Sequence, residues 1–377
     1  MAEVAATNPA SRARSLRVVV AWFLVTRLIV LAVAQVGGAN AIDRFKDAWA
    51  PGNKFLSTGT PPHPLLEPTV RWDAILYIGL AREGYTPPRE GPVWDIAFFP
   101  AYPYAVSLLE NVVGDTFIAA FILSHVEALL AALLILLLGR RHFSEELGLR
   151  AAMLFLCAPG AGFLSYPYTE AQFAMFTTLA LLLSLENRPL SAGLAGALAS
   201  ATRSTGLVVT LVLLWSAWEH RRDVRVAFER LVGAALSTGG IVAYSLFCWQ
   251  RHGDPLAWMH IQKWWNRHTS VLGPFKAFLA FDHDPDYYLV SITAIVVAVM
   301  ALRRMPIWVS LANAFLILLP ISTGTLASMI RFQSNNVPLL LSAAKLLEGK
   351  RFRIAVVACT ALMMFETYLY AVGYAHN

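Results

Sequence analysis

Residues 71–104 read RWDAILYIGLAREGYTPPREGPVWDIAFFPAYPY, and this stretch decides how the rest of the chain is interpreted. It gathers carboxylates, cations, tyrosines and prolines, whereas most of the chain consists of long apolar segments. Apolar segments resume directly after it. Because charged side chains are costly inside the hydrocarbon, such a stretch marks a place where the chain leaves the membrane, and it is the first place to search for chemistry.

The first part of this stretch has the spacing of a short amphipathic helix. Over residues 72–85 the apolar side chains recur every three or four positions, while Asp73 and Tyr77 share another face. A helix of about 14 residues is too short to span a bilayer, so we expect it to lie along the interface and to present Asp73 there. Residues 98–113, broken by prolines, are expected to form a second interfacial segment.

The composition is that of an integral membrane protein. The chain has 377 residues, of which 57% are hydrophobic and 14% charged, with a mean hydropathy of +0.55. The net charge of +6 is spread over short loops, which indicates membrane topology rather than nucleic-acid binding. The three cysteines lie in apolar runs without metal-ligand or disulfide spacing. No repeat or soluble domain is evident, so we expect a single all-α domain over residues 1–377.

Several apolar segments approach the roughly 17–25 residues that a spanning helix needs. They are residues 18–36, 115–138, 149–165, 168–185, 227–249, 286–302, 306–322, 333–347 and 354–374. Arginines precede the first segment, as in a signal peptide, but its length of about 19 residues is enough to span, and we expect an uncleaved anchor.

Residues 189–218 form a further apolar stretch that is interrupted at Arg203. One long helix would bury this cation in the hydrocarbon at a cost of at least ~2.5 kcal/mol, whereas two short spans meeting at Arg203 would place it at a surface. With two spans, about eleven in all, the basic loops at 140–150, 219–225, 303–304 and 345–353 share the cytoplasmic side. The same count places the candidate site residues on the opposite, non-cytoplasmic side.

Arg27 lies near the middle of the first apolar segment, where a cation is expected to be paired. Glu127 lies at a similar depth in the segment 115–138. We therefore predict a structural contact between Arg27 and Glu127.

Three carboxylates are candidates for chemistry. Asp73 has the chemistry of a general base that deprotonates an attacking hydroxyl, or it is a first-turn residue stabilised by the helix dipole. Asp95 is expected to cap the next helix, with a second carboxylate that orients a substrate or binds a cation as the alternative. Glu170 and Tyr168 lie at a predicted helix start, either lining a polar cleft or, for Glu170, complementing the dipole.

Cations flank the other apolar segments on the same predicted side. Arg203 and Arg331 suit phosphate as forked donors, with snorkelling to lipid headgroups as the alternative. In residues 252–268, His260, Gln262, Lys263 and Arg267 alternate with tryptophans. This composition is typical either of sugar stacking with Lys263 near a phosphate or of an interfacial tryptophan belt. The histidine spacing matches no metal-ligand pattern, and no metal site is predicted.

The run W-D-A-x-x-Y-x-x-x-A-x-x-G-Y followed by F-F-P-x-Y-P resembles the signature of the GPI mannosyltransferase 2 (PIG-V-like) family, which consists of polytopic GT-C glycosyltransferases. Further segments resemble that family in the same order: SYPYTEAQF (165–173), ATRSTG (201–206), HGDPLAWMHIQKWW (252–265) and RFQSNNVP (331–338). The chain departs from the family at Leu76, where histidine is frequent, and at Thr205, where asparagine is frequent. These departures bear on the acceptor more than on the reaction.

The resemblance implies a GT-C-like fold and an inverting transfer of mannose from a polyprenyl-phosphate donor to a membrane-anchored glycan or glycolipid, without a cofactor or a nucleotide site. Asp73 would be the base. The donor phosphate would be held by Arg203, Arg331 and Lys263. The acceptor or sugar would be contacted by Arg71, Trp72, Tyr77, Tyr168, Glu170, His260 and Gln262.

Two alternatives remain open. A lipid or sugar transporter also carries intramembrane charges, but it is expected to place polar groups on both sides of its path and to show two-half symmetry. A related GT-C enzyme that uses another sugar or a protein acceptor is the other alternative.

Overall fold

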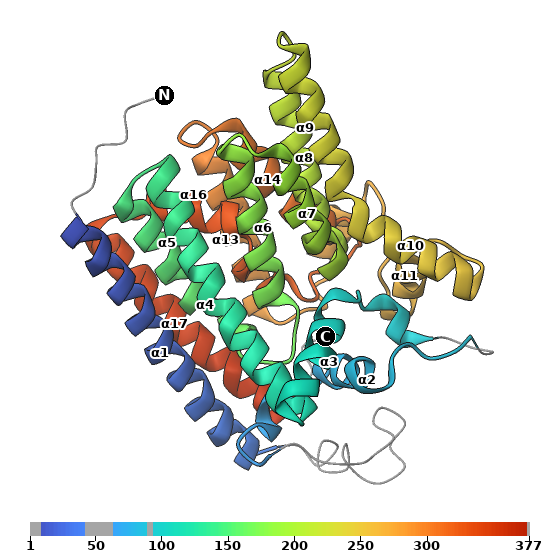
Figure 1. The fold of residues 1–377 in the computed structure, drawn as a ribbon. Helices are drawn as coiled ribbons and strands as arrows, with labels where there is room; N and C mark the ends of the chain where they lie inside the picture. The colour runs from blue at the N-terminus through green and yellow to red at the C-terminus, as the bar shows by residue number, and fades with distance from the viewer. Residues whose placement is uncertain (1–8, 42–62, 89–92, 375–377) are drawn as a thin grey trace.

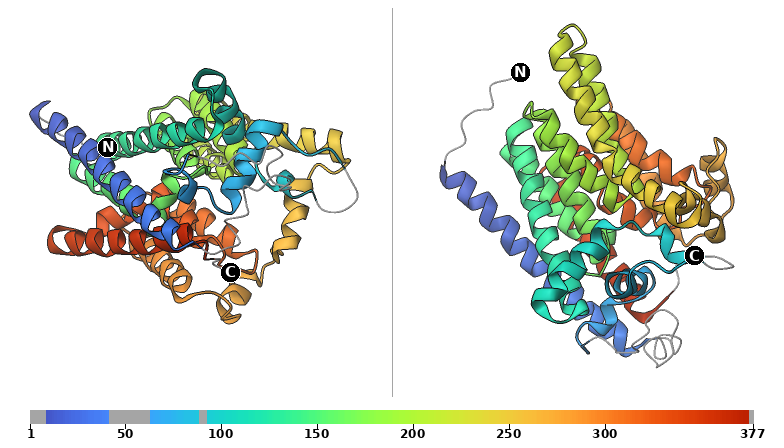
Figure 2. Two further views of the ribbon diagram at one scale, coloured as in Figure 1. Left: turned by 90° about the horizontal axis from the view of Figure 1, so that it is seen from below. Right: turned by 45° about the vertical axis from the view of Figure 1, so that its right-hand side comes forward.

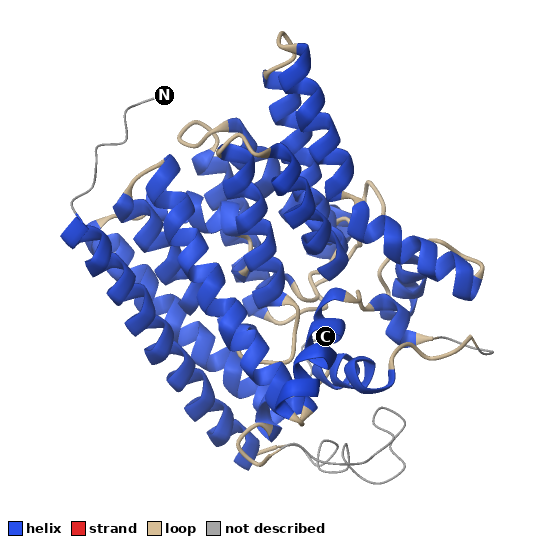
Figure 3. Cartoon of the chain, in the orientation of Figure 1, coloured by secondary structure: helices blue, strands red, loops and turns tan. Residues whose placement is uncertain are grey.

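The computed structural model describes residues 9–41, 63–88 and 93–374. Within these ranges the chain forms helices and loops and no strand (Figure 3). The predicted all-α class is therefore confirmed. Residues 42–62, which precede the stretch that begins at Arg71, lie outside the described residues.

Among the described residues, four helices are long and apolar enough to cross a membrane. They are α1 (Pro9–Ala39), α4 (Thr116–His142), the nearly continuous pair α9 (Val224–Ser237) and α10 (Gly239–His252), and α17 (Gly349–Val372). Shorter apolar helices are α6 (Glu170–Leu185), α8 (Val208–Glu219), α13 (Pro285–Ala301), α14 (Ile307–Ile321) and α16 (Val337–Leu346). This is the architecture of a polytopic membrane protein, as the sequence predicts; α1 and α17 lie side by side along one flank (Figures 1 and 2).

Two predicted segments end differently from the expectation, and proline explains both. The helix predicted over 149–165 is α5 (Glu145–Cys157), because Pro159 cannot continue the ladder and begins the 3₁₀ segment η4 (Pro159–Leu164). The helix predicted over 333–347 is divided into α15 (Met329–Ser334) and α16, whose first turn carries Pro338.

The apolar stretch 189–218 breaks at Arg203, as predicted. α7 (Pro189–Thr202) ends there, and η5 (Ser204–Leu207) turns the chain back into α8. Gly206 packs against the backbone of Ala199, so a larger residue would not fit the turn. Arg203 is therefore at the end of two helices rather than inside one.

The basic loops gather at one end of the bundle, which we call the basic end. Arg150 donates to the Leu347 carbonyl at 2.7 Å, Phe143 contacts Trp308, and Arg141 pairs with a glutamate that follows α6. The turn between α8 and α9 projects from the same upper end in Figure 1. This grouping is the one expected if the four basic loops lie on one side of the membrane.

Shorter helices cover the opposite end. α2 (Asp73–Glu83) packs on α3 (Ala101–Val113), and the Tyr77 and Tyr102 rings meet edge to face. Both helices fall within the predicted interfacial segments. The remaining short elements are η2 (Glu67–Thr69), η3 (Trp94–Ala97), α11 (Ala257–His260), η6 (Ile261–Trp265) and α12 (Gly273–Leu279).

Two predicted contacts are wrong. Asp95 does not cap the next helix: its Oδ2 accepts from the Thr86 amide at 2.6 Å and closes the loop after α2. Arg27 does not meet Glu127, which accepts instead from Gln172 at 2.8 Å. The Arg27 guanidinium donates to the carbonyls of Leu156 and Ala161 at 2.9 and 2.6 Å and to Ser165 Oγ at 3.0 Å. The end of α5 and the 3₁₀ segment leave carbonyl oxygens that a buried cation can satisfy.

Candidate active site

Asp73 begins α2 directly after a strained residue. Trp72 has φ 54° and ψ −125°, a backbone conformation that is costly for any residue except glycine. Two tyrosines hold the backbone of the preceding residue, Arg71. Its amide donates to Tyr370 Oη at 3.0 Å, and its carbonyl accepts from Tyr370 and Tyr168 at 2.9 and 3.3 Å. These contacts fix the turn that aims the Asp73 carboxylate, and strain of this kind is concentrated at functional sites.

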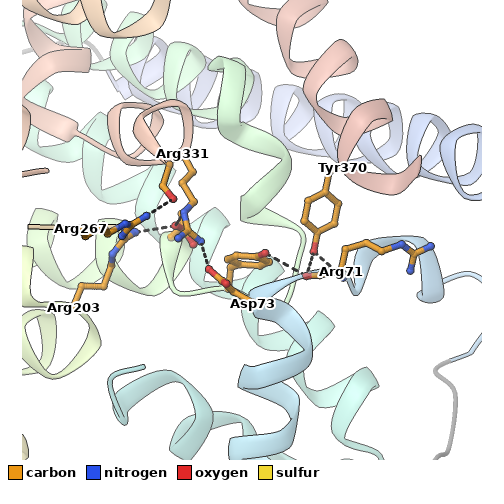
Figure 4. A network of polar contacts seen from close by, with 9 residues as sticks. Arg71, Asp73, Arg203, Arg267, Arg331 and Tyr370 are labelled. Atoms are coloured by element: carbon orange, nitrogen blue, oxygen red, sulfur yellow. Dashed lines mark hydrogen bonds and ion pairs between the residues drawn. The ribbon is translucent and has the colours of Figure 1, made fainter. Parts of the chain in front are cut away.

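Arg331 reaches Asp73 from a distant part of the chain. Its guanidinium donates to Asp73 Oδ2 at 2.9 Å and lies 3.8 Å from Glu170 Oε1. The same Glu170 oxygen accepts from Arg203 at 2.8 Å. Glu170 begins α6, Arg203 ends α7 and Arg331 lies in α15, so three helix termini meet α2 here (Figure 4).

A third guanidinium, that of Arg267, enters the same cluster (Figure 4). It donates to Ser328 Oγ at 3.1 Å, and its buried Nε has no hydrogen-bond partner. Within the described ranges Arg267 forms no ion pair. Burial lowers the pKa of Arg267 to about 10, and the charge of Arg331 adds to this decrease while Asp73 opposes it.

The five ionisable side chains just described, here called the arginine cluster, contain more positive than negative charge. Three guanidinium groups, of Arg203, Arg267 and Arg331, face the two carboxylates of Asp73 and Glu170. Burial alone would lower the pKa of Arg331, but the two carboxylates outweigh burial and raise it above its ordinary value. The cluster therefore has a surplus of one positive charge, which is the electrostatic condition for binding an anion.

Aromatic rings support the cluster from one side. The Arg203 guanidinium lies 4.3 Å from the Phe332 ring centre, and that of Arg331 lies 5.2 Å from the same ring and 5.4 Å from Tyr168. A guanidinium group that lies over the face of an aromatic ring is attracted to that ring. The rings therefore orient the two arginines.

The two carboxylates differ in accessibility. The Glu170 side chain is 2% exposed, which favours the anchoring of Arg203 and Arg331 over contact with a substrate. The Asp73 side chain is 31% exposed, and within the described residues its Oδ1 accepts no hydrogen bond. Asp73 is thus the more accessible carboxylate of the two.

Not all predicted site residues join the cluster. Asp73, Glu170, Arg203 and Arg331 are brought together, with Tyr77 and Tyr168 buried beside them. The Arg71 guanidinium points away from the cluster (Figure 4). It pairs with Glu67 at 2.7 Å, and the sugar contact predicted for it stays a prediction.

Within the described ranges, no hydrogen bond or ion pair joins the predicted residues of the loop after α10 to the arginine cluster. His260 pairs with Asp254 at 2.7 Å, and neither Lys263 nor Gln262 contacts the cluster within the described ranges. The tryptophans beside them pack on Trp94 of η3. Arg267 of the same loop, for which the sequence analysis predicts no role, is the cation that enters the cluster (Figure 4). Tyr370 was also missed, because a lone tyrosine near the end of an apolar segment carries no distinctive pattern.

The arrangement of the helices in this chain is a GT-C-like fold. Its solved neighbours include ArnT from Cupriavidus metallidurans bound to undecaprenyl phosphate, with a TM-score of 0.53 and 13% identity over 94% of this chain and 76% of that chain. This likeness shows the fold alone.

The family follows from the sequence comparisons. The family model described as mannosyltransferase (PIG-V) matches residues 62–262, more than half of the chain, so the chain belongs to this family. GPI alpha-1,6-mannosyltransferase 2 of Rattus norvegicus is 28% identical over 209 residues, which cover 50% of this chain and 40% of that protein. GPI mannosyltransferase 2 of Chaetomium globosum is 29% identical over 285 residues, covering 60% and 59%. The chain thus spans about two fifths of the length of the first relative.

Proposed function

We propose that this protein transfers mannose from a polyprenyl-phosphate donor to a hydroxyl group of a lipid-anchored glycan. The observation that carries the proposal is the arginine cluster, where surplus positive charge lies beside the partly exposed carboxylate of Asp73. Family membership supports mannose as the sugar. The printed names of the relatives, GPI mannosyltransferases, support a lipid-anchored acceptor.

The donor phosphate would bind at Arg203, Arg267 and Arg331. Guanidinium groups bind phosphate oxygens through paired, charge-assisted hydrogen bonds. A phosphate here would satisfy the free Nε of Arg267 and offset the excess positive charge. The structural neighbour ArnT is described as bound to undecaprenyl phosphate, which is a carrier of the same chemical class.

Transfer would proceed as a single inverting displacement. The acceptor oxygen bonds to the anomeric carbon while the bond from that carbon to the phosphate oxygen breaks. The hydroxyl proton passes to Asp73 Oδ1, and the electron pair leaves with the polyprenyl phosphate. Arginines placed where this negative charge develops stabilise the transition state.

The position of the arginine cluster favours an enzyme over a transporter. The cluster lies at the end of the bundle opposite the basic loops, and the positive-inside rule assigns those loops to the cytoplasm. The reaction would therefore take place on the non-cytoplasmic side. A transporter would need polar groups along a path to both sides.

The test uses purified protein in lipid nanodiscs with radiolabelled polyprenyl-phosphate mannose and a host lipid extract. Wild type should move label to a lipid-extractable acceptor, and Asp73→Asn should lower the rate by about 100-fold or more, as expected for the loss of a general base. Asp95→Asn is the matched control, because an amide oxygen can still accept from Thr86, and it should retain activity. If only a nucleotide-linked mannose served as donor, the assignment of a polyprenyl-phosphate donor would be wrong. If Asp73→Asn were active, the assignment of Asp73 as the base would be wrong.

A further inference from the structure

A row of aromatic rings begins beside the arginine cluster. The Arg331 guanidinium lies 5.4 Å from the Tyr168 ring centre, and the ring of Tyr168 lies 6.0 Å from that of Tyr77. Tyr77 follows Asp73 by about one turn of α2, and its ring meets that of Phe98 edge to face at 5.1 Å. The three rings are at most 7% exposed. Edge-to-face contacts at such distances are favourable, so they hold the buried part of the row in place.

Three tryptophans continue the row to the surface, and we call Trp94, Trp264 and Trp265 the tryptophan platform. Between ring centres, Trp265 lies 6.5 Å from Phe98 and 5.0 Å from Trp94 of η3. Trp264 lies 5.9 Å from Trp94. Exposure increases outward along the row: Trp265 is 38% exposed and Trp264 54%. The platform is therefore the part of the row that a ligand can reach, and packing on Trp94 orients its two exposed rings.

The platform is joined to the arginine cluster through the chain as well. Trp265 precedes Arg267 by two residues, so their Cα atoms are at most ~7 Å apart. Asn266 between them has φ 54° and ψ 26°, the left-handed conformation, and the Arg267 amide donates to the Gln262 carbonyl at 3.3 Å. This turn sends Arg267 into the cluster (Figure 4) and leaves the tryptophans before it at the surface. One short segment thus serves both places.

The surroundings of the platform suit a carbohydrate. A pyranose ring has C–H groups on its faces and hydroxyl groups around its rim, so it packs on an indole face while polar side chains bind the rim. The chain neighbours of the two exposed tryptophans, Lys263 and Asn266, are both exposed polar residues. A tryptophan belt at the membrane interface is the alternative. A belt needs exposed indoles but no row of buried rings that connects them to the helix of Asp73, and this row favours the carbohydrate.

We propose that the tryptophan platform binds the acceptor glycan, through the sugar rings that adjoin the hydroxyl reacting at Asp73. This inference rests on the proposed function and names the part of the acceptor that the protein recognises, which is its pyranose rings rather than its lipid anchor. The arginine cluster then holds the donor phosphate and the platform holds the acceptor, and the segment 264–267 fixes their relative position.

Binding of a soluble sugar tests the platform without donor or turnover. Protein in nanodiscs is mixed with the methyl glycoside of mannobiose, and saturation-transfer NMR reports which sugar protons contact the protein. Wild type should give signals from ring protons, and Trp264→Ala/Trp265→Ala should lose them. The matched control is Trp218→Ala/Trp249→Ala, which removes two tryptophans outside the row that are 59% and 58% exposed, and it should keep them. Equal signals from the platform variant and wild type, or none from wild type, would overturn the proposal.

Turnover separates glycan binding from membrane anchoring. Trp264→Ala/Trp265→Ala should raise the KM for the lipid-anchored acceptor about ten-fold and leave the KM for the donor and kcat unchanged, because only acceptor contacts are lost. Trp264→Phe/Trp265→Phe keeps a ring at each position and should restore most of the acceptor affinity. If both KM values rise together, or if the control pair has the same effect, the tryptophans anchor the protein and the platform is refuted. If wild type transfers no mannose while the sugar still binds, the proposed function fails and the platform stands.

Discussion

At the basic end of the bundle, Arg141 pairs with Glu186 and Arg225 with Glu229, each cation with one carboxylate. The four side chains range from partly exposed to almost fully exposed. In the arginine cluster at the other end, Arg203 and Arg331 share Glu170, Arg331 also holds Asp73, and Arg267 has no carboxylate. Arginine and carboxylate side chains therefore form balanced pairs at the basic end, whereas in the arginine cluster one guanidinium group lacks a carboxylate partner.

The difference follows from burial. An exposed ion pair gains little because water already solvates both charges, and it contributes about 0–1 kcal/mol. A buried charge must find partners or leave a large desolvation cost, so an arrangement that keeps an extra buried cation is expensive. Such an arrangement is expected where the missing partner is a ligand.

The largest effect is expected at the centre of the arginine cluster. Arg331→Met removes the cation that joins Asp73 to Glu170 and should lower the free energy of unfolding by about 3 kcal/mol, the low end of the range for broken buried pairs because Asp73 is partly exposed. Transfer activity should be lost. Arg225→Met, which breaks an exposed pair, is the control for thermal and denaturant unfolding in detergent. Equal stability of the two variants would contradict the comparison.

The strained turn before Asp73 offers a second test. Trp72→Gly and Trp72→Ala both remove the indole, so their difference reports the backbone at φ 54° and ψ −125°. Glycine tolerates this conformation, and the Gly variant should be the more stable of the two by roughly 1–3 kcal/mol. If the Ala variant is equally stable, the turn relaxes without cost and strain has no part in aiming Asp73.

The cation without a carboxylate should behave differently from Arg331. Arg267→Gln breaks no ion pair and removes a buried cation that has no carboxylate, so the unfolding midpoint should equal or exceed that of wild type. The KM for the polyprenyl-phosphate donor should rise about ten-fold, equivalent to ~1.4 kcal/mol. Lys263→Gln is the control from the same loop and should leave this KM unchanged. A larger effect of Lys263→Gln would restore the assignment made from the sequence.

The sequence predicts the fold class and the central part of the site. Hydropathy predicts the helices, and the break at Arg203 follows from the cost of a buried charge. Counting spans places Asp73, Glu170, Arg203 and Arg331 on one side, and the structure brings these four together although Asp73 and Arg331 are 258 residues apart. Topology thus carries long-range information that local motifs do not.

The contacts within loops and helix ends could not be predicted in the same way. The sequence suggests a glutamate partner for Arg27, because a buried cation is expected to pair with a carboxylate. In the structure its guanidinium donates to backbone carbonyls. Carbonyl groups occur at every residue, and only the three-dimensional path reveals which ones lack a partner. For the same reason the choice between Lys263 and Arg267 depends on the path of the loop, whose His268 and Ser270 amides donate to the carbonyls of Thr323 and Ser322 just after α14. No periodicity in residues 252–268 encodes that path.

The smallest change in the free energy of unfolding is expected at the basic end, where the ion pairs are exposed. Arg141→Gln removes the pair with Glu186, but the Arg141 side chain is 51% exposed and water can solvate what remains. The free energy of unfolding should change by less than about 1 kcal/mol, donor KM should not change, and any difference should shrink further as salt screens the pair. The free energy of unfolding of Arg141→Gln and of Arg331→Met should be measured at low and at high ionic strength. If Arg141→Gln lost several kcal/mol at both ionic strengths, burial would not be what distinguishes the basic end from the arginine cluster.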